Sequence, residues 1–191
     1  MIIGITGGSG SGKSVLSALF AADGYFVIDC DAIVHKLYGG KQYIDAVCAA
    51  FPEVRTADGI DRKKLASIVF SEPDELKKLD GAVLPLIRAA VLAEAADKKG
   101  YRGVILDAPT LFEAGLEKEC DFVIGVIADK NIRISRIVSR DKISESEARA
   151  RIASQKSDDF YRGHCDFTVC NNGAQELCEI YGELKKKIGG V

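Results

Sequence analysis

The residues best suited to chemistry form a glycine-rich segment near the N-terminus. Residues 7–14 read Gly-Gly-Ser-Gly-Ser-Gly-Lys-Ser and fit the pattern GxxxxGK[ST] at every fixed position. In such loops the glycines let the backbone wrap around phosphate groups, and the following helix adds its positive N-terminal end. Lys13 can reach the β- and γ-phosphates, and the Ser14 hydroxyl can ligate Mg²⁺. An ordinary glycine-rich turn is the alternative, but the position between a strand and a helix favours phosphate binding.

The elements that would position this loop alternate between short apolar strands and helices. Strands are expected over residues 2–6, 25–28, 104–106, 122–127 and 167–169. Helices are expected from 13 to 23, in three stretches through about 99, in a charged pair over roughly 130–158, and from 177 to 188. Such an alternation predicts a parallel sheet with helices on both faces, and ligands of such sheets gather at the carboxyl ends of the strands.

Three local signals define these helices further. Pro85 is expected in the first turn of the last of the three stretches, and Gly100 at its end. The second helix of the charged pair opens with a capping box from Ser144 to Glu147. Leu177 and Ile188 bound a stretch of apolar residues at helical spacing.

Polar groups follow two of the later strands. Asp107 ends the third strand, beside the expected P-loop strand, where an acidic residue could hold a water ligand of Mg²⁺. A loop-entry aspartate that satisfies backbone amides is an equal alternative. Asn171-Asn172-Gly173 follows the fifth strand and could frame an adenine ring with backbone groups, or form an ordinary turn.

Three arginines form a stripe on the helix that follows the fourth strand. Arg133, Arg136 and Arg140 occur at helical spacing, opposite Ile134 and Ile137. Such a stripe is usually a solvated face. Here it occurs where P-loop kinases carry a lid, and guanidinium groups match phosphates bidentately.

Composition and charge exclude several classes of protein. The chain has 191 residues, 47% of them hydrophobic and 28% charged, with a net charge of −2. This balance gives no electrostatic footprint for nucleic acid or an anionic membrane. The N-terminus does not fit a signal peptide, and no apolar stretch approaches the length of a membrane span. The six cysteines form no CxxC pair, so we expect reduced thiols in a cytoplasmic protein.

An ordered set of motifs along nearly the whole chain resembles one family. No GTPase signature is present, since neither DxxG at the third strand nor Asn-Lys-x-Asp occurs. The motifs after the P-loop are Val27-Ile-Asp-Cys-Asp31, Gly59-Ile-Asp-Arg62 with Leu65, Val69 and Phe70, Asp107-Ala-Pro-Thr-Leu-Phe-Glu113, Arg136 with Arg140, Arg151-Ile-Ala-Ser-Gln155, and Asp166-Phe-Thr-Val-Cys-Asn-Asn-Gly173. Each is weak alone, but in this order they resemble dephospho-CoA kinases.

The resemblance implies a fold and a reaction. The fold is α/β, a P-loop NTPase fold with a five-stranded parallel sheet flanked by helices, a helical acceptor-binding subdomain and a helical lid. We expect one domain with its core at 1–31, 101–129 and 159–191, the acceptor-binding insert at about 32–100 and the lid at about 130–158. The reaction would transfer the γ-phosphoryl group of ATP to the ribose 3′-hydroxyl of dephospho-CoA, the last step of CoA biosynthesis. Mg²⁺ would accompany ATP, and no obligate protein partner is evident.

The resemblance also implies roles for single residues. Asp31 is the candidate base or orienter of the acceptor hydroxyl, unless it or Asp29 only caps the next helix. Lys13 and Arg140 are the other catalytic candidates. The ATP-binding set is Gly8, Ser9, Gly10, Ser11, Gly12, Lys13, Ser14, Val15, Arg136, Arg140, Asn172 and Gly173. The acceptor-binding set is Asp31, Arg62, Pro109 and Leu111, with a surface arginine as the alternative for Arg62, and the metal set is Ser14 with Asp107 through water.

The chain departs from the family pattern at four positions. Leu84 stands at a usual histidine, Val15 at a threonine, Cys30 at an alanine and Arg133 at a glutamine. None of these changes removes a phosphate-handling group. Two other functions stay open: a nucleoside or nucleoside-monophosphate kinase, against which only the later motifs argue, and a nucleotide-dependent regulatory switch, against which the absent GTPase signatures and the lid pattern argue.

Overall fold

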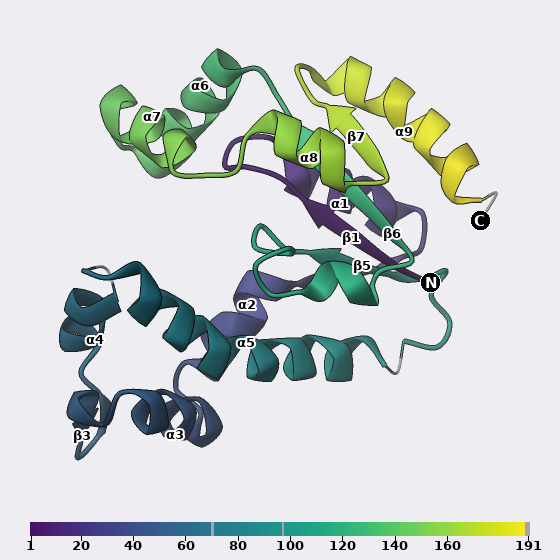
Figure 1. Cartoon of the computed structure of the whole chain (residues 1–191). Helices are drawn as coiled ribbons and strands as arrows, with labels where there is room; N and C mark the ends of the chain where they lie inside the picture. Colours follow the sequence, from purple (N-terminus) through teal and green to yellow (C-terminus); the bar gives the residue numbers. More distant parts are fainter. Residues whose placement is uncertain (70, 97, 190–191) are drawn as a thin grey trace. The chain divides into compact units, whose positions relative to one another are not determined.

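The chain forms two compact units. The computed structural model describes residues 1–69, 71–96 and 98–189, apart from the side chains of residues 174–176, and Figure 1 shows its elements. Unit 1 consists of Met1–Ile28, Lys98–Phe112 and Leu116–Val191, and unit 2 of Asp29–Asp97 and Glu113–Gly115. The expected lid therefore belongs to the same unit as the P-loop. Phe70, part of one quoted motif, lies outside the described residues.

A five-stranded sheet carries the P-loop. The strands are β1 (Ile2–Thr6), β2 (Phe26–Asp29), β5 (Val104–Asp107), β6 (Phe122–Ile127) and β7 (Phe167–Cys170), in the order β2-β5-β1-β6-β7. β1 pairs in parallel with β5 and β6, and β6 pairs in parallel with β7. Both faces of the central strand are covered, since Ile3 and Ile5 on one face and Gly4 and Thr6 on the other are all buried. All five expected strands are confirmed.

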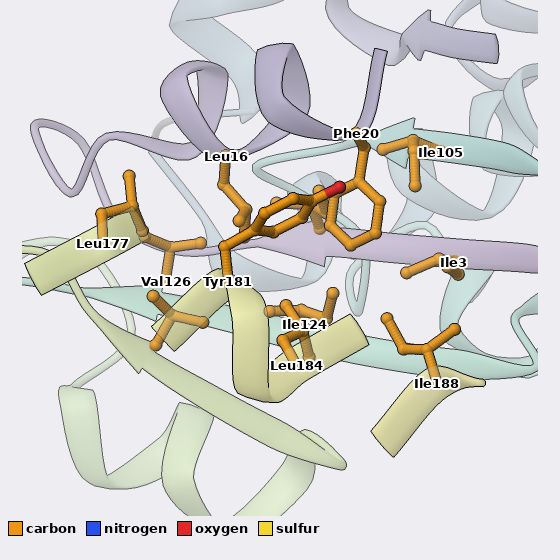
Figure 2. Close-up of a cluster of buried hydrophobic side chains, with 12 residues drawn as sticks. Ile3, Leu16, Phe20, Ile105, Ile124, Val126, Leu177, Tyr181, Leu184 and Ile188 are labelled. Carbon is orange, nitrogen blue, oxygen red and sulfur yellow. The ribbon is translucent and has the colours of Figure 1, made fainter. Parts of the chain in front are cut away.

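Helices α1 (Lys13–Ala22) and α9 (Ala174–Ile188) cover one face of this sheet. Figure 2 shows their side chains converging on the strands, with Phe20 and Tyr181 at the centre of the cluster. The two rings meet edge to face with centroids 5.0 Å apart, a favoured arrangement of aromatic pairs. The apolar spacing from Leu177 to Ile188 thus reports the buried face of α9, as expected.

Three helices lie between β6 and β7, and the first two form the charged pair expected as the lid at about 130–158. They are α6 (Lys130–Asp141), α7 (Glu145–Ala153) and α8 (Asp158–His164), and Leu116–Glu119 forms a short 3₁₀ turn earlier in the unit. The predicted capping box of α7 is confirmed, since Ser144 and Glu147 satisfy each other's backbone N–H groups. Helix α8 was not predicted. Its seven residues are too few to show periodicity, although Ser157 caps it by accepting from the Phe160 N–H.

Unit 2 is mainly helical. It contains α2 (Cys30–Leu37), α3 (Lys41–Ala50), α4 (Arg62–Val69) and α5 (Pro73–Ala95), with a 3₁₀ turn at Pro52–Val54 and a small antiparallel hairpin of β3 (Arg55–Thr56) and β4 (Gly59–Ile60). The prediction of three helical stretches is therefore wrong. Strands of two residues are too short to show an alternating pattern, so the hairpin was not predicted.

Pro85 lies inside α5 and not in the first turn of a helix, so that prediction is wrong as well. A proline in a helix removes one hydrogen bond, here the one that would reach the Gly81 carbonyl. Both residues lie on the exposed side of α5, where water can satisfy that carbonyl, while Val83, Ile87 and Val91 bury the opposite side. Packing thus overrides the local signal, and the helix ends at Ala95, before Gly100. No helix of the described ranges is both long and apolar enough to cross a membrane.

Candidate active site

The loop between β1 and α1 has the conformation that its glycines allow. Gly12 adopts a left-handed backbone with a φ of 92° and serves as the N-cap of α1 without any side-chain cap. A Cβ atom at this position would overlap the Nδ2 atom of Asn171. A non-glycine residue here would therefore suffer both backbone strain and a clash. The uncapped first turn of α1 directs its N–H groups and the positive end of its dipole at the loop, as an anion requires.

The two functional side chains of the motif stand at the start of α1. The Lys13 ammonium donates to the Gly7 carbonyl at 2.8 Å, so the lysine side chain reaches back along the loop. Ser14 is exposed, and the side chain of Val15, the next residue, is 49% exposed. The loop thus offers a cation and a hydroxyl beside an uncapped helix terminus, the combination that binds a polyphosphate.

Asp107 lies at the carboxyl end of β5, where the sequence predicted an acidic residue beside the P-loop strand. It is in register with Ile5 of β1, which confirms that position. Its Oδ2 atom accepts a hydrogen bond of 2.8 Å from the Ser17 hydroxyl of α1. The carboxylate is therefore held close to the first turns of α1, on which Ser14 lies.

The three arginines of α6 differ in what they contact. Arg136 is half-buried, and its Nη1 atom donates to the carbonyls of Gly10 at 3.1 Å and Ser11 at 3.4 Å. Arg133 is almost completely buried and also contacts the loop. Arg140 does not, because its side chain is 64% exposed and pairs with Asp141. The stripe is thus a solvated face only at its C-terminal end.

Asp141 forms ion pairs with two arginines of the lid. It accepts hydrogen bonds from Arg140 at 2.7 and 3.0 Å and also pairs with Arg151 of α7. The hydrogen bond from Arg140, supported by the one from Arg151, lowers the pKa of Asp141 to about 2. Asp141 is therefore ionised throughout the physiological pH range and keeps both guanidinium groups at the junction of α6 and α7.

The two asparagines after β7 hold other segments with their side chains. Asn171 is buried, and its Nδ2 atom donates to the Ser11 carbonyl at 2.9 Å. Asn172 accepts from the Asp129 N–H, at the start of α6, at 2.9 Å. The sequence predicted either an adenine frame or an ordinary turn here, and this support of the P-loop was not predicted. The sequence signal that could have indicated this contact is an amide side chain directly after a parallel strand, next to the P-loop edge of the sheet.

Gln155 is a second residue whose contact with the P-loop was not predicted, since the sequence indicated it only as part of a motif. Its Oε1 atom accepts from the Ser9 N–H, and its Nε2 atom donates to the Ser9 hydroxyl, both at 2.9 Å. Gln155 belongs to the segment that follows α7. The lid region therefore contacts the P-loop backbone from two places in the chain.

In unit 2 the structure distinguishes the two aspartates near the start of α2. Asp29 is the N-cap, with its Oδ1 atom accepting from the Ala32 N–H at 3.0 Å. Asp31 is exposed in the first turn of the helix. The alternative that one of the two caps the helix is therefore correct for Asp29, which is the N-cap residue of α2.

Arg62 borders a small cavity within unit 2. Its guanidinium lies over the ring of Tyr38, 5.8 Å from the centroid. The cavity measures about 100 Å³ and is otherwise lined by Tyr43, Ile60 and Leu65. Arg62 is exposed, so its charge is accessible to a ligand.

The two residues proposed for the acceptor from the third-strand motif differ in accessibility. Pro109 is half-buried, and its carbonyl accepts from the Thr6 hydroxyl at 3.3 Å. Leu111 is fully buried, with its methyl groups packed against Gly4 of β1. The Leu111 side chain is therefore part of the core, and its place in the acceptor-binding set stays a prediction that only its backbone could fulfil.

Comparisons with known proteins agree on one family. A family model for dephospho-CoA kinase matches residues 1–176. The dephospho-CoA kinase of Fusobacterium nucleatum is 37% identical over 178 residues, covering 92% of both chains. That of Geobacillus kaustophilus is 39% identical over 181 residues, covering 92% of this chain and 90% of the relative. The solved dephospho-CoA kinase from Campylobacter jejuni superimposes with a TM-score of 0.64 at 27% identity, covering 97% of this chain and 98% of that one.

Proposed function

Since the chain belongs to the dephospho-CoA kinase family, a family of kinases that phosphorylate a hydroxyl group, we propose a role in this reaction for each site residue. The overall reaction moves the γ-phosphoryl group of ATP to the ribose 3′-hydroxyl of dephospho-CoA. The bond between that group and the β-phosphate oxygen breaks, and a bond to the 3′-oxygen forms. ADP leaves, and the hydroxyl proton is lost.

The P-loop of unit 1 binds the triphosphate. The observation that supports this most directly is the uncapped N-terminus of α1 behind a loop whose lysine already reaches along it. Phosphoryl transfer has a loose transition state, so positioning and charge neutralisation provide most of the catalysis. Lys13 supplies one positive charge to the phosphates, and Gly8–Val15 supply the surrounding loop and helix start.

The residues near the P-loop fit a bound Mg²⁺. The ion prefers oxygen ligands and keeps several waters, and the exposed Ser14 hydroxyl and the Asp107 carboxylate present oxygens from α1 and β5. Ser14 would ligate the ion directly, and Asp107 would hold one of its waters. When bound, Mg²⁺ would neutralise charge on the β- and γ-phosphates.

Two arginines of α6 act on the phosphates from the lid. Arg136 already contacts the loop carbonyls, so a small change of rotamer brings its charge to the nucleotide. Arg140 is held at the end of the helix by Asp141 and supplies its guanidinium to the transferred group. Asn172 and Gly173 border the base through their backbone groups.

The acceptor is handled by Asp31, Arg62 and Pro109. Asp31 orients the 3′-hydroxyl and accepts its proton, a role that its exposed place in the first turn of α2 permits. The exposed guanidinium of Arg62 pairs with the diphosphate of dephospho-CoA. A cytoplasmic location and the absence of nucleic-acid and obligate protein partners stay predictions from the composition.

The test is a comparison of acceptors at fixed ATP and Mg²⁺. ADP release should be fastest with dephospho-CoA and near background with uridine, cytidylate, adenylate or no acceptor. Mass spectrometry and 3′-specific nuclease treatment of the product should place the new phosphate on the ribose 3′-oxygen. Faster turnover with a nucleoside or nucleotide would contradict the substrate assignment, and equal release without acceptor would indicate a regulatory ATPase.

A further inference from the structure

Arg133 is the charged residue whose position is least expected from the sequence. Its exposure is only 4%, although its place in the arginine stripe suggested a solvated or phosphate-facing side chain. A buried guanidinium is strongly unfavourable unless hydrogen bonds and opposite charges compensate it. Its partners therefore indicate what the burial accomplishes.

The partners of Arg133 connect the P-loop to two segments of the lid. Its Nε atom donates to the Ser9 carbonyl at 2.9 Å. One terminal nitrogen donates to Gln155 Oε1 at 3.1 Å, and the other lies 3.4 Å from the Asp158 carboxylate of α8. Each of the three guanidinium nitrogens thus contacts a different acceptor. An ammonium group has a single nitrogen and could not span these three acceptors in the same way.

Ser9 is held at each of its polar groups by this pair of residues. Arg133 binds its carbonyl, while Gln155 binds its N–H and its hydroxyl. We call this set of contacts among Ser9, Arg133 and Gln155 the P-loop brace. A loop composed largely of glycine has little intrinsic preference for one backbone conformation. The brace supplies from outside the order that the loop sequence lacks.

Close packing of α6 on the loop makes the brace possible. A Cβ atom at Gly8 would overlap the Nη2 atom of Arg133, and one at Gly10 would lie 2.7 Å from the Arg133 carbonyl. These two glycines therefore have a second function besides curvature around phosphate. They leave space for the arginine and for the backbone of α6.

We propose that Arg133, together with Gln155, is a positioning residue that pre-organises the P-loop for the β- and γ-phosphates of the nucleotide. It acts through Ser9 and does not touch the substrate. A loop that is already ordered avoids the loss of conformational entropy on binding, so the brace raises nucleotide affinity. This inference rests on the proposed binding of ATP by the P-loop.

The test replaces Arg133, measures the Kd for ADP by calorimetry, and measures the KM for each substrate by steady-state kinetics. Arg133→Met keeps the length and apolar volume of the side chain but removes its donors. We expect the Kd for ADP and the KM for ATP to rise about tenfold or more, the effect of losing a hydrogen bond to a charged group. The KM for dephospho-CoA should change less than twofold. Arg133→Gln, which retains an amide donor, should recover part of the lost affinity.

The matched control is Arg149→Met on α7. Arg149 is an exposed arginine of the same region, paired with Glu145 at 2.6 Å, and it does not contact the P-loop in the described structure. Its replacement should leave all three constants unchanged. If Arg133→Met does not fold, Gln155→Met removes the other half of the brace and should show the same selective loss of ADP affinity.

Three results would overturn the proposal. One is wild-type ADP affinity in both Arg133→Met and Gln155→Met. Another is a parallel rise of the KM for dephospho-CoA, which would indicate a general loss of structure. The third is equal ADP affinity of the Met and Gln variants at Arg133, which would show that a donor at this position does not matter. Wild-type protein that binds no ADP would contradict the proposed function itself, which separates the two failures.

Discussion

At the scale of single residues, Lys13 shows how the site is arranged before a nucleotide binds. Its ammonium donates to a carbonyl of the loop that it serves, at 2.8 Å from Gly7. A phosphate is a stronger acceptor for an ammonium than a neutral carbonyl is, because the hydrogen bond becomes charge-assisted on both sides. The proposed role of Lys13 therefore requires only that its ammonium exchange a neutral carbonyl for a charged phosphate oxygen.

Replacing this lysine should affect the reaction far more than the fold. We expect Lys13→Ala to lower kcat by about 10²-fold or more, because the lysine charge stabilises the charge on the phosphates in the transition state. The melting temperature should change little, since the side chain is only partly buried. Lys77→Ala, in an exposed pair with Asp74, is the control. A near-normal rate for Lys13→Ala at saturating ATP would show that the P-loop was misinterpreted.

Asp29 and Asp31 form a natural pair for separating capping from catalysis. We expect Asp31→Asn to lower kcat by about 10²-fold, the lower end of general-base effects, because a loose transition state requires little help from a base. Its KM for ATP and its melting temperature should stay near wild type. Asp29→Asn should leave kcat near wild type as well, because asparagine caps a helix about as well as aspartate.

Steady-state kinetics and thermal melts on both variants separate the two roles. A normal kcat for Asp31→Asn would exclude a base or orienting function. A lower melting temperature with an unchanged kcat would instead assign Asp31 a structural role in α2. The comparison is informative because Asp29, two residues away, already fills the cap.

At the scale of elements, α5 carries a carboxyl group in an unfavourable environment. Partial burial of Asp80, and then the nearby charge of Glu113, raise the pKa of its carboxyl group above the usual value for an aspartate. The folded state thus binds this proton more tightly than the unfolded state does. The contribution of Asp80 to stability is therefore lost as pH rises from the unfolded pKa through the higher folded pKa.

Removing this charge should stabilise unit 2 at neutral pH. We expect Asp80→Asn to raise the melting temperature at pH 7 modestly, because the side chain is still partly solvated. The difference from wild type should shrink as pH falls below about 4, where aspartate is protonated in both states. Asp74→Asn serves as the control, since Asp74 is exposed in the first turn of the same helix and pairs with Lys77. A pH-independent difference would contradict the assigned cause.

At the scale of the whole molecule, the order of the strands decides what can meet at the P-loop. Because β1 lies between β5 and β6, the loop that follows it has Asp107 on one side and the segment leading to α6 on the other. These segments are about a hundred residues from the loop in sequence. The parallel pairing places their carboxyl ends at one edge of the sheet, which is where ligands of such folds bind.

Much of this arrangement follows from local sequence. The strands at 2–6 and 122–127, the capping box at Ser144 and the P-loop could be predicted because each depends on neighbouring residues alone. Apolar periodicity reports which side chains are buried, and the glycine pattern reports a backbone conformation that other residues avoid. The motifs that indicated the family are likewise short runs of neighbouring residues, read in their order along the chain.

The support of the loop was decided only by the tertiary structure. The hydrogen bond from Ser9 to Gln155 joins residues 146 positions apart, and no local pattern encodes which polar groups a fold brings together. Periodicity distinguishes the apolar face of a helix from its polar face, so Arg133 was expected to lie in a solvated stripe. It does not reveal that the polar backbone of another segment, here the P-loop, covers that polar face. The expectation for Pro85 was wrong for a related reason, since packing along α5 overrides what a proline favours on its own.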